Sequence, residues 1–173
     1  MKKPMKYTLA VLLAVLTFPN AYAAEPKTKL KQPEINGAVA AYEKTGVKRC
    51  LQRISQVTDF LTTGSKSSMF LFSPPDQPDN RMLSTSMEIA QASGLSYASA
   101  SFHPRDGGCG SVYEAVTYWQ DSCDAVAKRV YPSLRQTGLV QTYIRVMDGG
   151  PAMRLFLMPA GTGCVAIKKE VLY

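Results

Sequence analysis

The densest group of residues that could do chemistry is His103-Pro104-Arg105-Asp106, which contains the only histidine of the chain. An imidazole can act as a general base, a carboxylate can orient it, and a serine hydroxyl can be the nucleophile. Ser101 lies two residues before His103 and would share its face if the segment is a strand. The set His103, Asp106 and Ser101 therefore predicts a small hydrolase as an alternative function.

Two observations weigh against that hydrolase. The sequence has no G-x-S-x-G motif around any serine. A polar loop that joins two strands also accounts for the same residues, because loop side chains are usually solvated. We therefore predict no catalytic residue and expect the protein not to be an enzyme.

Metal and cofactor chemistry find no support in the residue spacing. The four cysteines contain no C-x-x-C pair, and the single histidine is not spaced from any of them as in a zinc motif. The aspartates form no calcium loop, and neither G-x-x-x-x-G-K-[ST] nor G-x-G-x-x-G occurs. We predict no metal site and no cofactor.

The first 23 residues have the layout of a secretory signal peptide. Three lysines precede a mostly apolar run over 8–18, and Ala21-Tyr22-Ala23 forms an A-x-A cleavage signal. The apolar run is shorter than the roughly 20 residues that a membrane span needs. We expect cleavage after Ala23 and a periplasmic protein, with full secretion as the alternative, and no membrane span.

The rest of the chain has the size of one domain. Removing 23 of the 173 residues leaves 150, and the loss of three lysines lowers the net charge from +7 to +4. A mildly basic chain without a stripe of Lys and Arg does not indicate nucleic-acid binding. Residues 24–36 are rich in Lys and Pro and predict a flexible leader, so the domain is expected over 37–173.

Hydrophobic periodicity predicts an α+β fold. Apolar residues at 47, 50, 51, 54, 57 and 61, with Thr58 on the same stripe, indicate a helix over 37–63 that ends at Gly64. Period-two patterns predict strands over 68–73, 81–90, 95–103 and 111–119. A second helix from about Ser122 to Gly138 and strands over 140–147, 153–158 and 165–172 follow. The order α-ββββ-α-βββ predicts a mostly antiparallel sheet packed on one face by two helices.

The four cysteines predict two disulfides, because the count is even and the chain is expected to be exported. A strand over 111–119 would hold Cys109 and Cys123 about 26 Å apart at about 3.3 Å per residue, whereas bonded Cα atoms lie within about 7 Å. Cys109 and Cys164 each follow a glycine-rich turn and begin a strand. We therefore expect the pairs Cys109–Cys164 and Cys50–Cys123.

The face of the sheet opposite the helices is the candidate binding surface. Short hydroxyls beside Tyr and Arg would form a flat surface of the kind that protein interfaces use, although a wet face is also ordinary for an antiparallel sheet. The expected binding residues are Ser84, Ser86, Tyr97, Ser99, Ser101, Arg145 and Arg154.

The leading functional hypothesis is a non-enzymatic, exported cell-envelope protein that binds another protein. It would act as an inhibitor, an immunity protein or an accessory subunit. Besides the hydrolase, a periplasmic carrier of a small apolar ligand is a second alternative, since the chain has eight methionines, although methionine is a common core filler. The oligomeric state is not predicted.

Overall fold

The computed structural model describes residues 37–92 and 94–173, which form an α+β fold. The predicted fold class is therefore confirmed, whereas the predicted signal peptide and the predicted leader lie outside the described residues. In chain order the elements are α1 (Gly37–Lys44), α2 (Leu51–Thr62), β1 (Lys66–Phe72), the 3-10 turn η1 (Pro78–Asn80), β2 (Leu83–Gln91), β3 (Gly94–Arg105), β4 (Gly108–Trp119), α3 (Cys123–Arg129), β5 (Arg135–Leu139), β6 (Arg145–Asp148), β7 (Met153–Ala160) and β8 (Gly163–Leu172).

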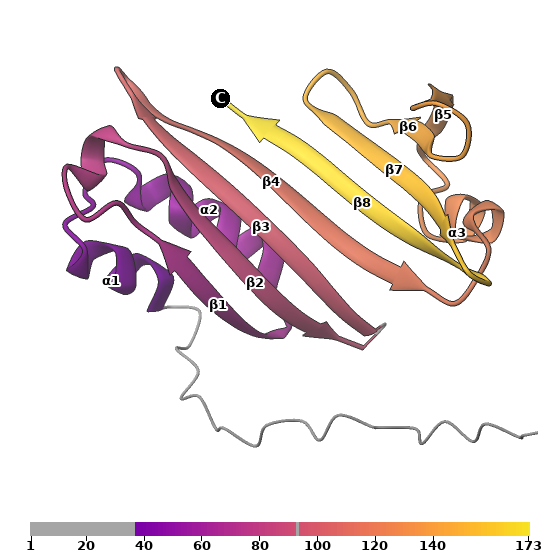
Figure 1. The fold of residues 1–173 in the computed structure, drawn as a ribbon, viewed down its shortest axis with the longest axis horizontal. Helices are drawn as coiled ribbons and strands as arrows, with labels where there is room; N and C mark the ends of the chain where they lie inside the picture. Colours follow the sequence, from indigo (N-terminus) through magenta and orange to yellow (C-terminus); the bar gives the residue numbers. More distant parts are fainter. Residues whose placement is uncertain (1–36, 93) are drawn as a thin grey trace, which may run out of the picture. The chain divides into compact units, whose positions relative to one another are not determined.

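The strands form one eight-stranded sheet in the order β1-β2-β3-β4-β8-β7-β6-β5, and every neighbouring pair is antiparallel. β1 to β4 form one meander, and β5 to β8 form a second meander that returns to place β8 beside β4 (Figure 1). The first strands of the two meanders, β1 and β5, are consequently the two edges of the sheet.

The predicted helix over 37–63 is two helices. The chain turns at Gly46, which has φ of 91°, a left-handed conformation that a helix interior does not contain. The Thr45 hydroxyl donates a hydrogen bond to the Tyr42 carbonyl at 2.8 Å and closes the end of α1. The predicted apolar stripe holds along α2, where Ile54 and Val57 are buried.

The second predicted helix is shorter than expected. The Ser122 side chain caps α3 by accepting a hydrogen bond from the Ala125 N–H at 3.4 Å. The helix ends at Arg129, before Pro132, whose ring cannot continue a helix. Residues 135–138, expected in that helix, belong to β5, and the expected strand over 140–147 reduces to β6 after a turn.

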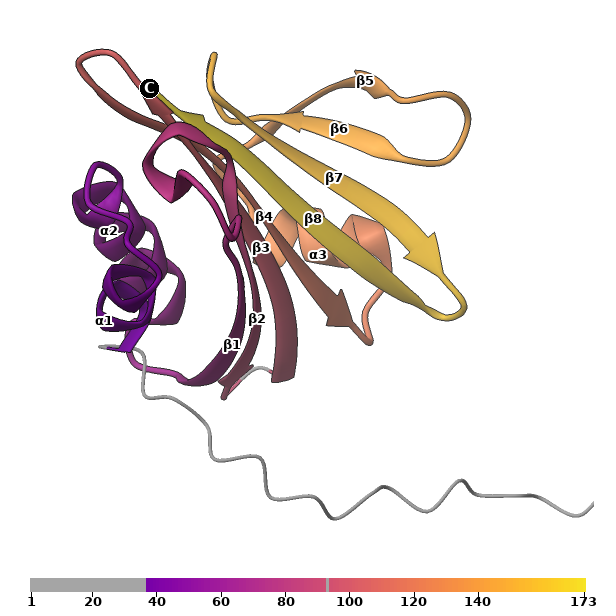
Figure 2. The same ribbon diagram turned by 60° about the vertical axis from the view of Figure 1, so that its left-hand side comes forward.

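All three helices lie on one face of the sheet. The strand register identifies this face, since residues paired directly across antiparallel strands point to the same side. One such row contains Met69, Met87, Ala98, Ala115, Lys168, Leu155 and Met147. Its members on β1 to β3 pack in the core under α1 and α2, and Leu155 and Met147 pack in the core under α3. Figure 2 shows α1 and α2 on one side of the curved first meander. We call this side the inner face and the opposite side the outer face.

Two separate clusters of buried residues form the core. The larger one, under α1 and α2, contains Tyr42 and Phe102, whose rings meet edge to face at 6.4 Å between centroids. Burial raises the pKa of Tyr42, and its hydroxyl donates to the Ser84 carbonyl at 2.6 Å. The smaller cluster, under α3, includes Val126 and Leu157.

Both disulfides form, but the predicted pairing is wrong. Cys50 bonds Cys109, and Cys123 bonds Cys164, with Cα–Cα distances of 5.3 and 5.0 Å. The reason is the direction of β8: it runs antiparallel to β4, so Cys164 lies opposite Trp119, at the end of β4 that leads to Cys123.

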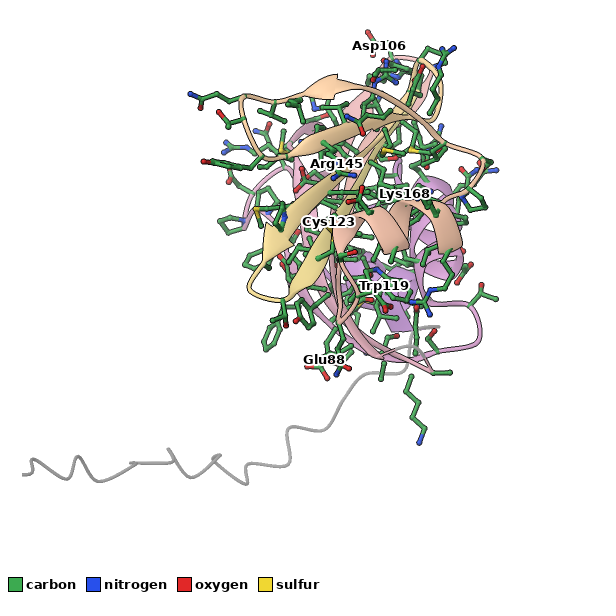
Figure 3. The ribbon with its side chains drawn as sticks, turned by 90° about the vertical axis from the view of Figure 1, so that its right-hand side faces the viewer. Glu88, Asp106, Trp119, Cys123, Arg145 and Lys168 are labelled. Atoms are coloured by element: carbon green, nitrogen blue, oxygen red, sulfur yellow. A yellow bond between two sulfur atoms is a disulfide. The ribbon has the colours of Figure 1, made fainter. Side chains whose placement is uncertain are left out.

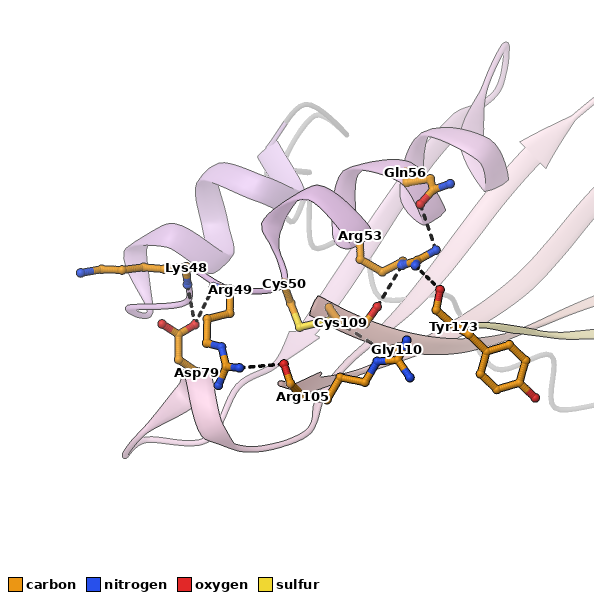
Figure 4. The surroundings of a disulfide bond; sticks show 10 residues. All are labelled: Lys48, Arg49, Cys50, Arg53, Gln56, Asp79, Arg105, Cys109, Gly110 and Tyr173. Atoms are coloured by element: carbon orange, nitrogen blue, oxygen red, sulfur yellow. Dashed lines mark hydrogen bonds between the residues drawn. A yellow bond between two sulfur atoms is a disulfide. The ribbon is translucent and has the colours of Figure 1, made fainter. Parts of the chain in front are cut away.

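The first disulfide joins the start of α2 to the start of β4, and Arg53 reinforces this junction (Figure 4). Its guanidinium donates to the Cys109 carbonyl at 3.1 Å and to the Tyr173 carbonyl at 2.7 Å. Asp79 accepts hydrogen bonds from the backbone N–H groups of Lys48 and Arg49. The turn before β2 is thereby fastened to the segment that precedes α2.

Candidate functional site

The residues of the alternative hydrolase do not assemble into a catalytic set. Ser101 and His103 share the outer face of β3, as predicted, but the Ser101 hydroxyl donates to the Ser84 hydroxyl at 3.4 Å. Asp106 lies at the tip of the β3–β4 turn with a fully exposed side chain, 3.7 Å from Arg49. Among the described residues, no hydrogen bond joins His103 to either of the other two.

Five of the seven expected binding residues lie together on β2 and β3 of the outer face. Ser84 is opposite Ser101, and Ser86 is opposite Ser99. The Ser86 and Tyr97 hydroxyls lie 3.0 Å apart, and Tyr97 remains half exposed. This part of the face has the short hydroxyls that the sequence predicted.

Arg154 also lies on the outer face, but Arg145 does not. Arg145 pairs across the sheet with Leu157, an inner-face residue, and its guanidinium bonds the Asp124 carboxylate of α3. Figure 3 shows Arg145 on the side of the molecule that faces the viewer together with Cys123 at the start of α3. The hydrogen bond from Arg145, followed by its charge, lowers the pKa of Asp124. Arg145 therefore positions α3, and its predicted place on the binding face was wrong.

The outer face carries a row of charged residues across four strands. Glu114, Lys169, Arg154 and Asp148 are successive cross-strand neighbours on β4, β8, β7 and β6. Lys169 Nζ lies 2.7 Å from Glu114 Oε1, and Arg154 Nη1 lies 3.0 Å from Asp148 Oδ1. Ser99 continues this row onto β3, and we call the four ionised residues the charged row.

Beside the charged row lies an apolar patch that the sequence analysis missed. Two adjacent cross-strand rows consist of aromatic and aliphatic residues from β3 to β6. We define the apolar patch as Leu95, Tyr97, Val116, Tyr118, Val146, Phe156, Met158, Val165 and Ile167. Leu95, Tyr97 and Tyr118 are 60%, 50% and 48% exposed, and the other six are half-buried.

Gly163, the first residue of β8, allows β8 to approach β4 closely beside Tyr118. A Cβ atom on Gly163 would lie 2.4 Å from the Tyr118 hydroxyl and 2.4 Å from the Trp119 carbonyl oxygen. Only glycine allows β4 to approach the start of β8 this closely. The glycine therefore fixes one border of the apolar patch.

A signal for this patch is present in the sequence. Leu155, Phe156, Leu157 and Met158 are four consecutive apolar residues, and such a run is typical of a strand that is apolar on both faces. The period-two alternation used to assign the faces carries no information where both faces are apolar.

A small cavity of about 140 Å³ lies between α2 and the inner face, lined by Gln56, Val57, Phe60, Tyr113, Glu170 and Leu172. The Tyr113 hydroxyl bonds Glu170, and Lys168 Nζ lies 3.0 Å from Glu170 and 4.9 Å from the Phe60 ring centroid. Cavities of this size hold a benzene-sized group, whereas ligand pockets usually measure about 300–1,000 Å³. The cavity gives the ligand-carrier alternative little room.

Comparison with models of known protein families, with curated proteins and with solved structures found no match. None of the helices within the described ranges is long and apolar enough to cross a membrane. In the same residues, no three His, Cys, Asp or Glu side chains gather in a way that could hold a metal ion. The apolar patch and its charged border are thus the features from which a function has to be argued.

Proposed function

We propose that this protein is a non-enzymatic, exported cell-envelope protein that binds another protein through the outer face of its sheet. The apolar patch forms the centre of the interface, and the charged row forms one border. The observation that carries this proposal is the apolar patch itself. The solvent-exposed face of an antiparallel sheet normally carries polar residues, whereas this face presents nine apolar side chains in two adjacent rows.

The shape and chemistry of the patch favour a protein over a small ligand. Small molecules bind in concave pockets, whereas the patch is a sheet surface. Protein interfaces combine an apolar centre, enriched in Tyr, Phe and Met, with a polar rim. Tyr97, Tyr118, Phe156 and Met158 supply that centre, and the ion pairs of the charged row supply a rim that also constrains the orientation of the partner.

The proposed location follows from the signal peptide expected over 1–23 and from the disulfides. Cleavage after Ala23 would place the domain in the periplasm, and full secretion is the alternative. Two disulfides that use all four cysteines suit an oxidising compartment. Inhibitor, immunity protein and accessory subunit are the classes that such a binding protein would fill.

The proposal is tested by capture from envelope extract with the purified, immobilised protein. Wild type is compared with the double variant Tyr97→Ala/Tyr118→Ala, because Tyr is frequent among binding hot spots and both rings are exposed. The matched control is Phe60→Ala/Tyr143→Ala, which removes two exposed aromatic rings outside the patch.

We expect wild type and control to retain the same stoichiometric partner, and the patch variant to bind it at least tenfold more weakly, a change of about 1.4 kcal/mol or more. All three proteins should melt at nearly the same temperature. Equal loss in the control and patch variants, or full retention by the patch variant, would contradict the proposal.

A further inference from the structure

Within the described residues, the edge strand β1 has no strand partner on the side away from β2. β1 is the first strand in the sheet order, and in the described part of the chain its only strand partner is β2. Between described residues, no backbone hydrogen bond joins β1 to a turn, a loop or any element other than β2. Phe70 and Phe72 on its outer face are 69% and 57% exposed.

The opposite edge shows two devices that normally prevent strand pairing, a short strand and an irregular register, and β1 lacks both. β5 is five residues long and has an irregular register between Gln136 and Gly138. β1 has seven residues in an unbroken register with β2, no proline, and one charge, Lys66, at its first position. An edge of this kind accepts another strand through its free N–H and C=O groups.

β1 is also complementary to itself. In an antiparallel pair with a two-fold axis at Met69, all seven residues of both copies are paired and outer-face residues meet outer-face residues. Ser68 then lies opposite Phe70 of the second copy, Ser67 opposite Leu71, and Lys66 opposite Phe72. Each large apolar side chain faces a small or flexible one, and the two Lys66 side chains lie at opposite ends of the pair.

We propose that two copies of this protein pair antiparallel along β1, about a two-fold axis at Met69, so that their sheets become continuous. The pairing places Phe70 of one copy diagonally across from Phe70 of the other, within reach of an aromatic contact. It thereby covers the exposed ring pair of each edge. β1 contributes no residue to the apolar patch, so this dimer is independent of the proposed function.

The register makes a charge test available at Phe72, which would lie opposite Lys66 of the second copy. Within one chain these residues stand at opposite ends of β1, about 20 Å apart at about 3.3 Å per residue. The sign of a charge at Phe72 therefore affects Lys66 only in the dimer. Phe72→Lys and Phe72→Glu remove the same ring and differ only in that sign.

The experiment is sedimentation equilibrium of the purified protein over a wide concentration range. We expect wild type and Phe72→Glu to reach twice the mass of one chain, and Phe72→Lys to dissociate at least about tenfold more readily, because the two-fold axis doubles each charge contact. Lys66→Glu combined with Phe72→Lys should restore the dimer. Leu139→Lys on the β5 edge is the control and should remain dimeric.

Circular dichroism should show all variants folded, because Phe72 and Leu139 are exposed. A wild type that stays monomeric at every concentration would overturn the proposal. Dissociation by Leu139→Lys but not by Phe72→Lys would overturn it too, as would equal behaviour of Phe72→Lys and Phe72→Glu.

Discussion

The two halves of the sheet differ on both faces. Under α1 and α2, the inner face of β1 to β4 belongs to a cluster of 16 buried hydrophobic residues, whereas the cluster under α3 has seven. On the outer face, the serines Ser84, Ser86, Ser99 and Ser101 all belong to the first half, on β2 and β3, whereas β4, β8 and β7 carry six of the nine residues of the apolar patch. The patch therefore crosses the junction of the two halves at β4 and β8 and continues over the outside of the smaller core.

The fold of this chain does not explain why the residues of the apolar patch are apolar. α3 has seven residues and covers only part of β7 and β8, and the Cys123–Cys164 disulfide holds it in place. The valines and aromatic rings of the apolar patch lie on the other side and add nothing to that core. The proposed binding partner would give these residues a role.

The largest expected effect comes from removing the disulfides. From the sequence separations of 59 and 41 residues, the chain-entropy model gives about 4 kcal/mol of stability for each. We expect Cys50→Ala/Cys109→Ala and Cys123→Ala/Cys164→Ala to lose similar free energies of unfolding in urea. Only the second variant should lose hydrogen-exchange protection in α3, because the small core there does not hold the helix alone. Unchanged protection of α3 would show that the small core holds this helix without its disulfide.

A matched pair of core truncations compares the two clusters directly. Leu83 and Leu157 are both fully buried, the first in the larger cluster and the second in the smaller one. Leu→Ala substitutions cost about 2.7–5 kcal/mol, and the cost is higher where the surroundings cannot relax into the cavity. Urea unfolding should place Leu83→Ala near the upper end and Leu157→Ala near the lower end. The reverse order would show that the α3 half is the more rigid one.

An isosteric substitution separates the core under α3 from the outer face of the sheet. Val126→Thr buries a hydroxyl in the core under α3, where Val126 is fully buried, and should cost about 1–3 kcal/mol. Val116→Thr adds the same hydroxyl on the outer face and should change the stability of the free protein by less than about 1 kcal/mol. Thermal melting of both variants measures the difference. A larger loss for Val116→Thr would mean that the apolar patch is already covered within the chain.

The smallest effect concerns acid stability. Burial raises the pKa of Glu170, but hydrogen bonds from Tyr113 and Lys168 and the Lys168 charge outweigh it, so the pKa is lowered. Glu170 therefore stabilises the fold above its unfolded pKa of about 4.3, and this contribution is lost as the pH falls through the lower folded value. Glu170→Gln should flatten the melting temperature against pH below about 4.3.

Asp124 is the matched carboxylate of the other half. Arg145 lowers its pKa as well, but the carboxylate is exposed, and exposed ion pairs contribute little. Asp124→Asn should leave the same melting curve almost unchanged. If it flattens the curve more than Glu170→Gln does, the α3 half depends on its ion pair rather than on its disulfide.

The sequence predicts the first meander well and the second poorly, for a physical reason. β2, β3 and β4 alternate between buried and exposed residues, so period two reveals both the strands and the inner face. In β7 Arg154 was placed correctly on the outer face, but the residues after it are apolar on both faces, so alternation did not indicate the apolar patch. The pairing of β4 with β8 joins segments about 50 residues apart, and local patterns do not encode that choice. The cysteine pairs depend on it, and so their prediction failed.

The central claim is that the apolar patch contacts a partner protein, and site-specific photocrosslinking in intact cells tests it most directly. p-Benzoylphenylalanine replaces Phe156, at the centre of the patch, or Phe60, an exposed ring on α2 outside it. We predict one discrete adduct of higher mass from position 156 upon irradiation and none from position 60. An adduct from position 60 with none from position 156 would contradict the account.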